Sequence, residues 1–166
     1  MITIIGAGPA GSYLAYLLAK KGKDVALIEE HSKIGNPVQC TGIVTGSIEK
    51  FVKLKNSVVA NKLNKVIITS KNNKTDAKVD EIVLFRDKFD QYISDLAKNQ
   101  GVKILTAHKF MGIKNKNTIR VKDKKNNKIK TIKSDSIIGA DGPSSSVTRY
   151  ISQNQKSRFY IGMQAK

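Results

Sequence analysis

"MITIIGAGPAGSYLAYLLAKKGKDVALIEE" (residues 1–30) has the order strand, glycine-rich turn, helix, strand. Residues 2–5 are apolar and mostly β-branched, which is typical of a buried parallel strand. A G-x-G-x-x-G pattern follows, with glycine at positions 6, 8 and 11. Pro9 suits the first turn of a helix because its missing N–H group needs no partner there. Residues 24–30 return to an apolar run that ends in two acids. This order predicts an α/β fold that begins with two parallel strands joined by a helix.

Each glycine in this pattern has a separate physical reason. Gly6 allows a tight turn, Gly8 lets the backbone approach a pyrophosphate, and Gly11 lets the helix pack closely on the strand. The helix that starts at Pro9 and Ala10 then points its bare N–H groups at the phosphates. The pattern therefore predicts a dinucleotide-binding site.

The second strand ends in a pair of acids, Glu29 and Glu30. Glu29 lies 23 residues after Gly6, where a carboxylate can accept hydrogen bonds from ribose hydroxyls. A carboxylate there repels a 2′-phosphate, so NADP is not expected in this pocket. FAD and NAD share the fingerprint, and residues 1–30 alone do not separate them.

The amino-acid composition indicates the class of protein. The 166 residues are 40% hydrophobic, which predicts one globular domain, and 30 Lys and Arg against 13 Asp and Glu give a formal charge of +17. The lysines are scattered, and the most basic stretch, 114–133, contains no aromatic residue for base stacking. We therefore interpret most of the charge as a solvated surface and do not expect nucleic-acid binding. An anionic membrane surface stays open as a partner.

The cysteine count and the apolar runs limit the possible metal sites, disulfides and membrane spans. Cys40 is the single cysteine, which excludes an internal disulfide and any metal site built from several cysteines. We therefore expect no metal site. No charged leader precedes the first strand, and no apolar run approaches the length of a membrane span. These features predict a cytoplasmic protein, with peripheral attachment to the inner face of the membrane as an open alternative.

Periodicity predicts the elements of the middle of the chain. Residues 31–51 form a glycine-containing loop that turns into a helix near Ser47. Two strands, 63–70 and 78–85, flank a polar turn. An amphipathic helix is expected over 86–101, because its apolar residues fall on one stripe and Gly101 provides a stop.

The last third alternates between strands and turns. Residues 102–105 read as a strand, and 107–135 as a hairpin or meander with its lysines facing water. Residues 136–150 predict a strand that runs into a turn and a short helix. We expect Ser144 or Ser145 to cap this helix, with Val147 and Ile151 facing inward. A final strand is expected over 158–165.

Three stretches together resemble a known family: the glycine fingerprint, "RDKFDQYISDLAKNQGVKI" (86–104) and "IIGADGPSSSVTR" (137–149). This spacing resembles FAD-dependent oxidoreductases of the para-hydroxybenzoate hydroxylase fold. Within that group, "IGNPVQCTGIV" (34–44) is most similar to the geranylgeranyl reductase family. The resemblance implies a Rossmann-type, GR2-like, three-layer FAD-binding domain over 1–166. It also implies an antiparallel-sheet substrate domain, inserted around 52–85 and starting again near 158.

The resemblance implies a role for each matching residue. The glycine turn would hold the FAD pyrophosphate, and the acids after the second strand would hold the adenosine ribose. Arg86 would face the phosphate or ribityl region, Asp141 would bind the ribityl chain, and Gly142 would leave room for the flavin. Cys40, in the turn that contains Gly42, would lie beside the substrate cavity as the catalytic candidate. The cofactor-binding candidates are Gly6, Gly8, Pro9, Ala10, Gly11, Glu29, Glu30, Cys40, Gly42, Arg86, Asp141 and Gly142.

The residues alone also allow plainer roles. Arg86 can pair with a surface acid, Asp141 can simply form a turn, and Cys40 can be a small buried side chain. No neighbouring cation in the sequence argues for a lowered pKa of the Cys40 thiol. His31 is expected to be a solvated loop residue, and we assign no role to His108.

The family implies a reaction that adds hydride and a proton to double bonds of isoprenoid chains, including those of archaeal ether lipids. Its members are about twice this length and carry a second flavin motif, which we do not find after Gly142. We therefore expect the N-terminal part of a larger enzyme, completed by a C-terminal half or a partner chain. Two alternatives stay open: an FAD-dependent aromatic-type monooxygenase of the same fold, or a non-catalytic nucleotide-binding subunit.

Overall fold

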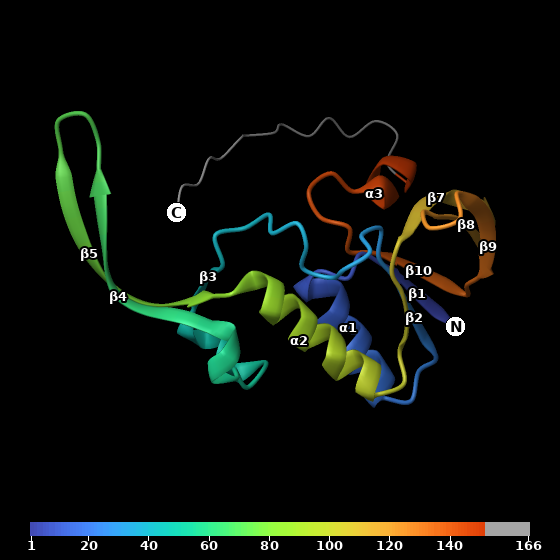
Figure 1. The fold of residues 1–166 in the computed structure, drawn as a ribbon, viewed down its shortest axis with the longest axis horizontal. Coiled ribbons are helices and arrows are strands. Elements are labelled where there is room, and N and C mark those ends of the chain that lie inside the picture. The colour runs from blue at the N-terminus through green and yellow to red at the C-terminus, as the bar shows by residue number, and fades with distance from the viewer. Residues whose placement is uncertain (152–166) are drawn as a thin grey trace. The chain divides into compact units, whose positions relative to one another are not determined.

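The computed structural model describes residues 1–151, which divide into two compact units. The first unit is formed by residues 1–36 together with the chain from Asp90 onward, and the second by Pro37–Phe89. Figure 1 shows the course of the chain. The strand expected over 158–165 lies outside the described residues.

The first unit is built on a four-stranded parallel sheet in the order β10-β1-β2-β6 (Figure 1). Its strands are β1 (Ile2–Ile5), β2 (Val25–Ile28), β6 (Lys103–Leu105) and β10 (Ser136–Gly139). All four residues of β2 are buried, as expected for a strand covered on both faces. The predicted strands at 2–5, 24–30, 102–105 and 136–139 are thereby confirmed.

Helices cover one face of this sheet. α1 (Pro9–Lys20) packs Ala15 against Ile4 and Leu27, and Ala97 from α2 (Arg86–Asn99) joins the same cluster. The predicted helix over 86–101 is confirmed, and Gly101 follows its end with a φ of +88°. None of the helices within residues 1–151 is long and apolar enough to span a bilayer.

A three-stranded antiparallel meander covers the other face. Its strands are β7 (His108–Asn115), β8 (Thr118–Asp123) and β9 (Lys128–Lys133). Phe110, Ile119 and Val121 pack against Ile5 and Ile28 of the parallel sheet. Helices, parallel sheet and meander together form the expected three-layer Rossmann-type domain. The predicted meander over 107–135 is therefore confirmed.

α3 (Ser146–Ile151) follows β10, and it agrees in part with the helix predicted from sequence. Val147 is buried in the same cluster as the meander, as predicted. Ile151 is 67% exposed, so the expectation that it faces inward was wrong. The helix is only six residues long, and Ile151 is its last residue, one turn beyond Val147, so the buried contact of the helix ends before Ile151.

The second unit is an antiparallel sheet in the order β3-β5-β4. Its strands are β3 (Ile43–Thr45), β4 (Val59–Thr69) and β5 (Lys74–Leu84), with 3₁₀ helices η1 (Gly46–Lys50) and η2 (Asn56–Val58) between β3 and β4. The strands predicted at 63–70 and 78–85 are present but longer than expected. Two register shifts in β4 break the alternation of apolar and polar residues, which hides the true ends of the strand.

Two features of this unit differ from the sequence prediction. The helix expected near Ser47 is the 3₁₀ helix η1, and β3 was not expected at all. β3 has only three residues and exists through its pairing with β5, where Ile43 lies opposite Val83. Whether these strands belong to a substrate domain stays a prediction.

Thr3 in β1 offers a direct test of this packing. Its side chain is fully buried, and its Oγ1 has no hydrogen-bond partner among the described residues. We expect Thr3→Val to raise the free energy of unfolding by about 1 kcal/mol, because valine has the same shape and removes the unpaired hydroxyl. Denaturant unfolding measures this change. Thr131→Val, on the exposed strand β9, is the control and should change stability by less than about 0.5 kcal/mol. A loss of stability in Thr3→Val would contradict the packing described.

Candidate functional site

The glycine turn closes the carboxyl end of β1. Gly6 has a φ of +101°, in the region that favours glycine, and its N–H donates to the carbonyl of Ile28 at 2.8 Å. A side chain at Gly6 would collide with the carbonyl oxygen of Ala140. The N–H of Ala140 in turn donates to the carbonyl of Ile5 at 2.7 Å. The turn is therefore fixed between the ends of β1, β2 and β10.

The other two glycines of the pattern differ from each other. A Cβ atom at Gly11 would collide with the carbonyl oxygen of Gly6 and lie 3.2 Å from the Cβ of Ala140. Gly11 is thus required by the packing of α1 on the turn. A Cβ atom at Gly8 would meet no protein atom within 4 Å. Internal packing does not require glycine at position 8, and the open space beside it is what the close approach of a ligand needs.

The amino end of α1 is suited to an anion. Pro9 is its first residue, Ala10 is exposed, and no side chain within residues 1–151 caps the helix at Gly8. The first turn contains no acidic residue. Its partial positive charge and free N–H groups are therefore left for a phosphate group.

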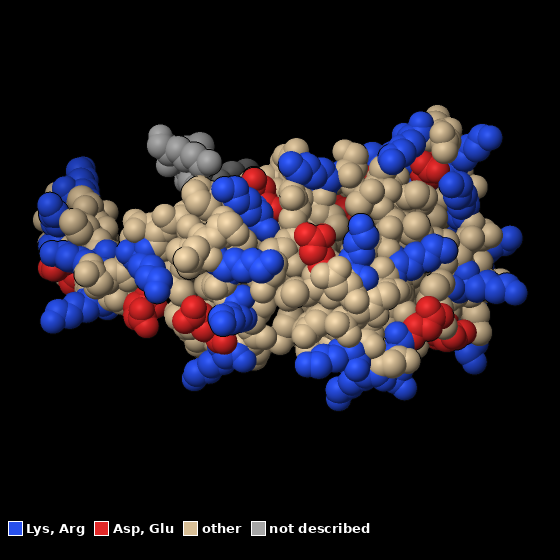
Figure 2. Space-filling view, turned by 60° about the horizontal axis from the view of Figure 1, so that its bottom comes forward, with Lys and Arg blue, Asp and Glu red and all other residues tan. Residues whose placement is uncertain are grey.

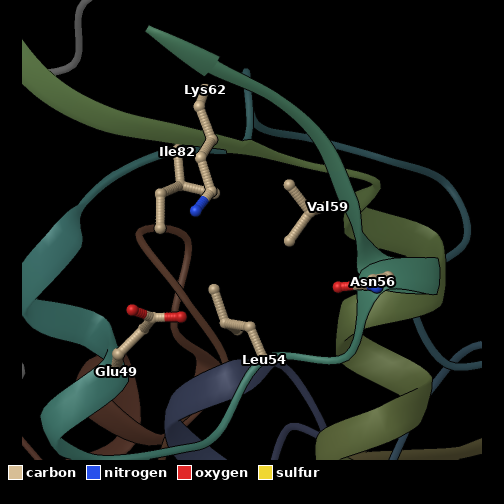
Figure 3. Close-up of a pocket in the computed structure, with 6 residues that line it drawn as sticks. All are labelled: Glu49, Leu54, Asn56, Val59, Lys62 and Ile82. Carbon is tan, nitrogen blue, oxygen red and sulfur yellow. The ribbon is translucent and has the colours of Figure 1, made fainter. Parts of the chain in front are cut away.

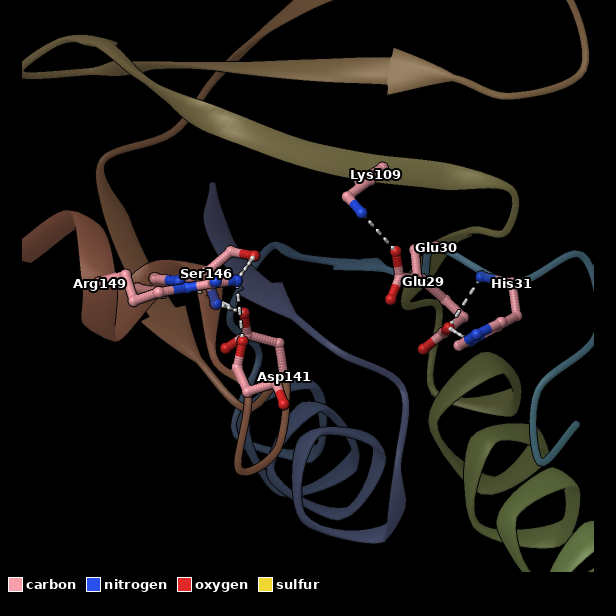
Figure 4. A network of polar contacts seen from close by, with 9 residues as sticks. Glu29, Glu30, His31, Lys109, Asp141, Ser146 and Arg149 are labelled. Atoms are coloured by element: carbon pink, nitrogen blue, oxygen red, sulfur yellow. Dashed lines mark hydrogen bonds and ion pairs between the residues drawn. The ribbon is translucent and has the colours of Figure 1, made fainter. Parts of the chain in front are cut away.

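Glu29 lies at the carboxyl end of β2 and is 9% exposed. Its Oε2 accepts the N–H of Ala7 at 2.9 Å, and its Oε1 accepts the backbone N–H of His31 at 2.9 Å (Figure 4). The His31 ring nitrogen Nδ1 lies 2.7 Å from the same Oε1. A carboxylate oxygen has two lone pairs, so Oε2, which accepts one hydrogen bond, can still accept a ribose hydroxyl, whereas Oε1 already has two partners. The carboxylate predicted to bind ribose is held in place by the glycine turn itself.

The neighbours of Glu29 have partners that the sequence did not reveal. His31 lies in a loop with its side chain 38% exposed, as expected, and it also bonds to Glu29, which was not expected. Glu30 lies 3.3 Å from Lys109 Nζ of β7 (Figure 4) and is directed at that cation. A contact between Glu30 and a cofactor stays a prediction.

Asp141 serves as a cap in this structure. Its Oδ2 accepts the N–H groups of Ser146 at 2.6 Å and Val147 at 3.3 Å, and its Oδ1 accepts the Ser145 hydroxyl at 2.6 Å (Figure 4). The Ser145 hydroxyl accepts the N–H of Thr148 at 2.9 Å, which confirms the predicted cap at Ser145. The predicted contact of Asp141 with a ribityl chain stays a prediction, as does the role of Gly142, which has a φ of +77° and open space beside it.

Cys40 lies in the second unit, in a turn fixed by Gly42. Gly42 has a φ of +80°, and a Cβ atom there would lie 2.5 Å from the carbonyl oxygen of Leu84 and 3.2 Å from Arg86 Cγ. The N–H of Leu84 donates to the carbonyl of Gly42 at 2.9 Å. The turn is thereby pinned to the end of β5, next to the residue that begins α2.

This arrangement activates the Cys40 thiol, which is exposed. A hydrogen bond from the Gly42 N–H is the main cause that lowers the pKa of the Cys40 thiol. Partial burial opposes it, and the charge of Arg86 lowers the pKa further. The sequence showed no cation near Cys40 because Arg86 lies 46 residues away in the chain. The neighbours of Cys40 in sequence therefore carried no sign of the lowered pKa.

A substitution at Arg86 tests this pair. Arg86→Gln removes a cation that lowers the pKa of the Cys40 thiol, so the thiolate fraction at neutral pH falls. We expect alkylation of Cys40 by iodoacetamide to slow by about threefold at neutral pH, with the pH profile displaced to higher pH. Cys40 is the single cysteine, so the reagent reports on it alone. Arg149→Gln is the matched control, and an identical profile in both variants would contradict the pairing.

A separate hollow of about 230 Å³ lies in the second unit (Figure 3). Leu54, Val59 and Ile82 form its apolar lining, and Glu49, Asn56 and Lys62 contribute polar side chains. None of the residues predicted for cofactor binding or catalysis lines it. Within residues 1–151, no three histidine, cysteine or acidic side chains gather in a way that could hold a metal ion.

The comparison with protein families separates the two dinucleotides that share the fingerprint. Residues 1–162 match the family described as FAD binding domain. The chain belongs to this family. The cofactor of this FAD-binding domain is therefore FAD, and the residues present fit it: open space at Gly8, an uncapped α1 and the fixed carboxylate of Glu29.

Several relatives of this FAD-binding domain are reductases. The chain is 30% identical over 167 residues to digeranylgeranylglycerophospholipid reductase 3 of Methanosphaera stadtmanae, covering 93% of this chain and 42% of the relative. It is 30% identical to an "uncharacterized protein in nifH2 5'region" of Methanosarcina barkeri, covering 89% of this chain and 85% of that protein. The chain spans about two fifths of the length of the reductase relatives it matches.

A solved structure agrees with these relatives. The structure of a geranylgeranyl bacteriochlorophyll reductase-like protein from Thermoplasma acidophilum superimposes with a TM-score of 0.79 at 25% identity. The match covers 91% of this chain and 41% of that protein. The FAD-binding domain therefore shares both sequence and fold with reductases of this kind.

Proposed function

We propose that this chain is the FAD-binding part of a reductase that hydrogenates carbon–carbon double bonds in isoprenoid lipid chains. The observation that carries the proposal is the open space at Gly8, at the uncapped start of α1 and next to the fixed carboxylate of Glu29. It occurs in an FAD-binding domain whose relatives are named digeranylgeranylglycerophospholipid reductases. The sequence match at the Cys40 turn favours the reductase over a monooxygenase.

Each part of the first unit has a task in cofactor binding. The N–H groups at the start of α1 bind the pyrophosphate, and Gly8 leaves the backbone free to approach it. Glu29 accepts the ribose hydroxyls and, through its charge, disfavours a phosphorylated ribose. When bound, the reduced flavin supplies a hydride to the alkene.

Cys40 is the proposed group for proton transfer. Its Sγ receives the Gly42 N–H and lies under the influence of Arg86, so the pKa of the thiol is lowered. Proton transfer is most effective when the pKa of the donor lies near the working pH. A thiol with a lowered pKa is thus better suited to deliver a proton and to take it back than an ordinary thiol.

FAD binding to the purified chain is the first test. Quenching of flavin fluorescence follows a titration with FAD, with NAD and FMN as competitors, at low and moderate salt. We expect FAD to bind more tightly than both competitors and to stay bound at moderate salt. Preference for NAD, or binding that disappears with salt, would contradict the assigned cofactor site.

Reduction of the alkene is tested separately. The chain, with FAD reduced by dithionite, is incubated with digeranylgeranylglycerophospholipid, alone and together with any polypeptide that copurifies with it. Mass spectrometry should show the gain of one hydrogen molecule for each double bond reduced. If FAD binds tightly but neither preparation reduces the lipid, the reductase proposal fails while the cofactor assignment stands.

A further inference from the structure

The meander has two faces of different character. Phe110, Ile119 and Val121 point inward and pack in the core. The residues between them point outward, and six of these form what we call the meander's outer face: Lys109, Met111, Arg120, Lys122, Ile129 and Lys133. Thr118 and Thr131 lie among them. The six residues of the outer face are exposed, apart from the half-buried Lys122. This face belongs wholly to the first unit.

The outer face is cationic without acids of its own. Four of its six residues are Lys or Arg, and Lys109 lies directly opposite Lys122 on the neighbouring strand. Like charges in such a pair destabilise a sheet, and within residues 1–151 Glu30, 3.3 Å from Lys109, offsets part of this repulsion. The single acid of these strands, Asp123, points inward and binds Lys130 Nζ at 2.7 Å. The cations of this face therefore favour a negatively charged partner.

Two exposed apolar side chains lie among these cations. Met111 is 43% exposed and Ile129 is 62% exposed, and Ile129 is the direct cross-strand neighbour of Lys122. Apolar side chains surrounded by cations fit the boundary between lipid headgroups and acyl chains. None of the six residues is aromatic, whereas grooves for single-stranded nucleic acid usually stack bases on aromatic rings.

We propose that the meander's outer face docks on an anionic lipid surface. In Figure 2, Lys and Arg side chains (blue) are spread over the whole view, including the right-hand side, on which Figure 1 draws β7, β8 and β9. Lysine and arginine bind the headgroup charges, while Met111 and Ile129 enter the interface. The chain is then a peripheral membrane protein. This proposal does not depend on the reductase activity.

Vesicle sedimentation with the full 166-residue chain tests the proposal. The vesicles contain phosphatidylcholine alone or mixed with phosphatidylglycerol. We expect binding to the mixed vesicles only. Arg120→Gln combined with Lys122→Gln should lower the partition coefficient by about 25-fold, from about fivefold for each cation near the surface. Ile129→Ser should lower the partition coefficient by about fivefold. The loss should be equal at high salt, because salt screens charges and not apolar contacts.

Matched controls separate this face from the overall charge of +17. Lys21→Gln combined with Lys23→Gln removes the same charge from exposed positions after α1, and Ile68→Ser changes an equally exposed isoleucine of β4. Both controls should bind vesicles nearly as the original chain does, and thermal unfolding should show that no variant is destabilised. Equal losses in variants and controls would overturn the proposal. So would the absence of vesicle binding, or tighter binding to single-stranded or duplex DNA than to anionic vesicles.

Discussion

Gly8→Ala is expected to lower the affinity for FAD by about 100-fold, which corresponds to losing about 3 kcal/mol of phosphate contacts. The Cβ atom would occupy the open space beside the start of α1, where no protein atom lies within 4 Å. It would keep the backbone away from the pyrophosphate. The fold should persist, because alanine at this helix cap costs only about 1 kcal/mol relative to glycine. The flavin titration and a thermal unfolding curve measure the two effects on the same sample.

Loss of binding together with loss of folding in Gly8→Ala would show that position 8 is structural. Unchanged FAD affinity would show that the cofactor does not approach this backbone. Either result would remove the central observation behind the assigned site. The expected result, a folded chain that no longer holds FAD, separates the cofactor contact from the packing of the turn.

Gly11→Ala is expected to have the opposite effect and to destabilise the fold by about 3 kcal/mol or more. In an ordinary helix, replacing glycine by alanine stabilises by about 1 kcal/mol. Here the new Cβ atom would collide with the carbonyl oxygen of Gly6, which is backbone and cannot rotate away. The sign of the change is therefore diagnostic. Urea unfolding measures it, and any gain in stability would contradict the close packing of α1 on the glycine turn.

Gly8→Ala and Gly11→Ala make the same chemical change at two positions of the glycine motif. In the unfolding measurement, Gly8→Ala is the control for Gly11→Ala. In the FAD titration, Gly11→Ala is the control for Gly8→Ala, measured at a low temperature at which Gly11→Ala is folded. If an added methyl group simply disturbed α1, both variants would lose both stability and FAD affinity. We expect Gly8→Ala to lose mainly FAD affinity and Gly11→Ala to lose mainly stability.

Much of the first unit could be predicted from sequence because its signals are local. Short stretches of a few residues are enough to predict the glycine turn, the strands on either side of α1 and the meander. The packing role of Gly11 follows from the same motif, and the structure supplies the reason in the carbonyl of Gly6. Strands buried on both faces, such as β2, also carry a continuous apolar pattern that is hard to mistake.

The errors arise where contacts are distant in sequence or surfaces are exposed. Arg86 acts on Cys40 across 46 residues, and no window of sequence reveals that pair. The bond between His31 and Glu29 was also not predicted, because a loop histidine carries no signal for such a bond, although the His31 side chain is exposed as expected. The strand β3 has three residues and exists through its partner β5, so periodicity could not find it.

The pairing of β1 with β10 has a consequence for synthesis of the protein. Met1 bonds to Asp135, 134 residues away, and Gly6 is closed in by Ala140. A ribosome therefore releases the glycine fingerprint first but cannot complete its surroundings until nearly the whole described chain has emerged. Contacts of such long sequence separation form late and slowly in folding. The nascent chain must pass through a period in which its nucleotide motif is exposed and unable to hold FAD, so cofactor capture has to wait for the emergence of β10.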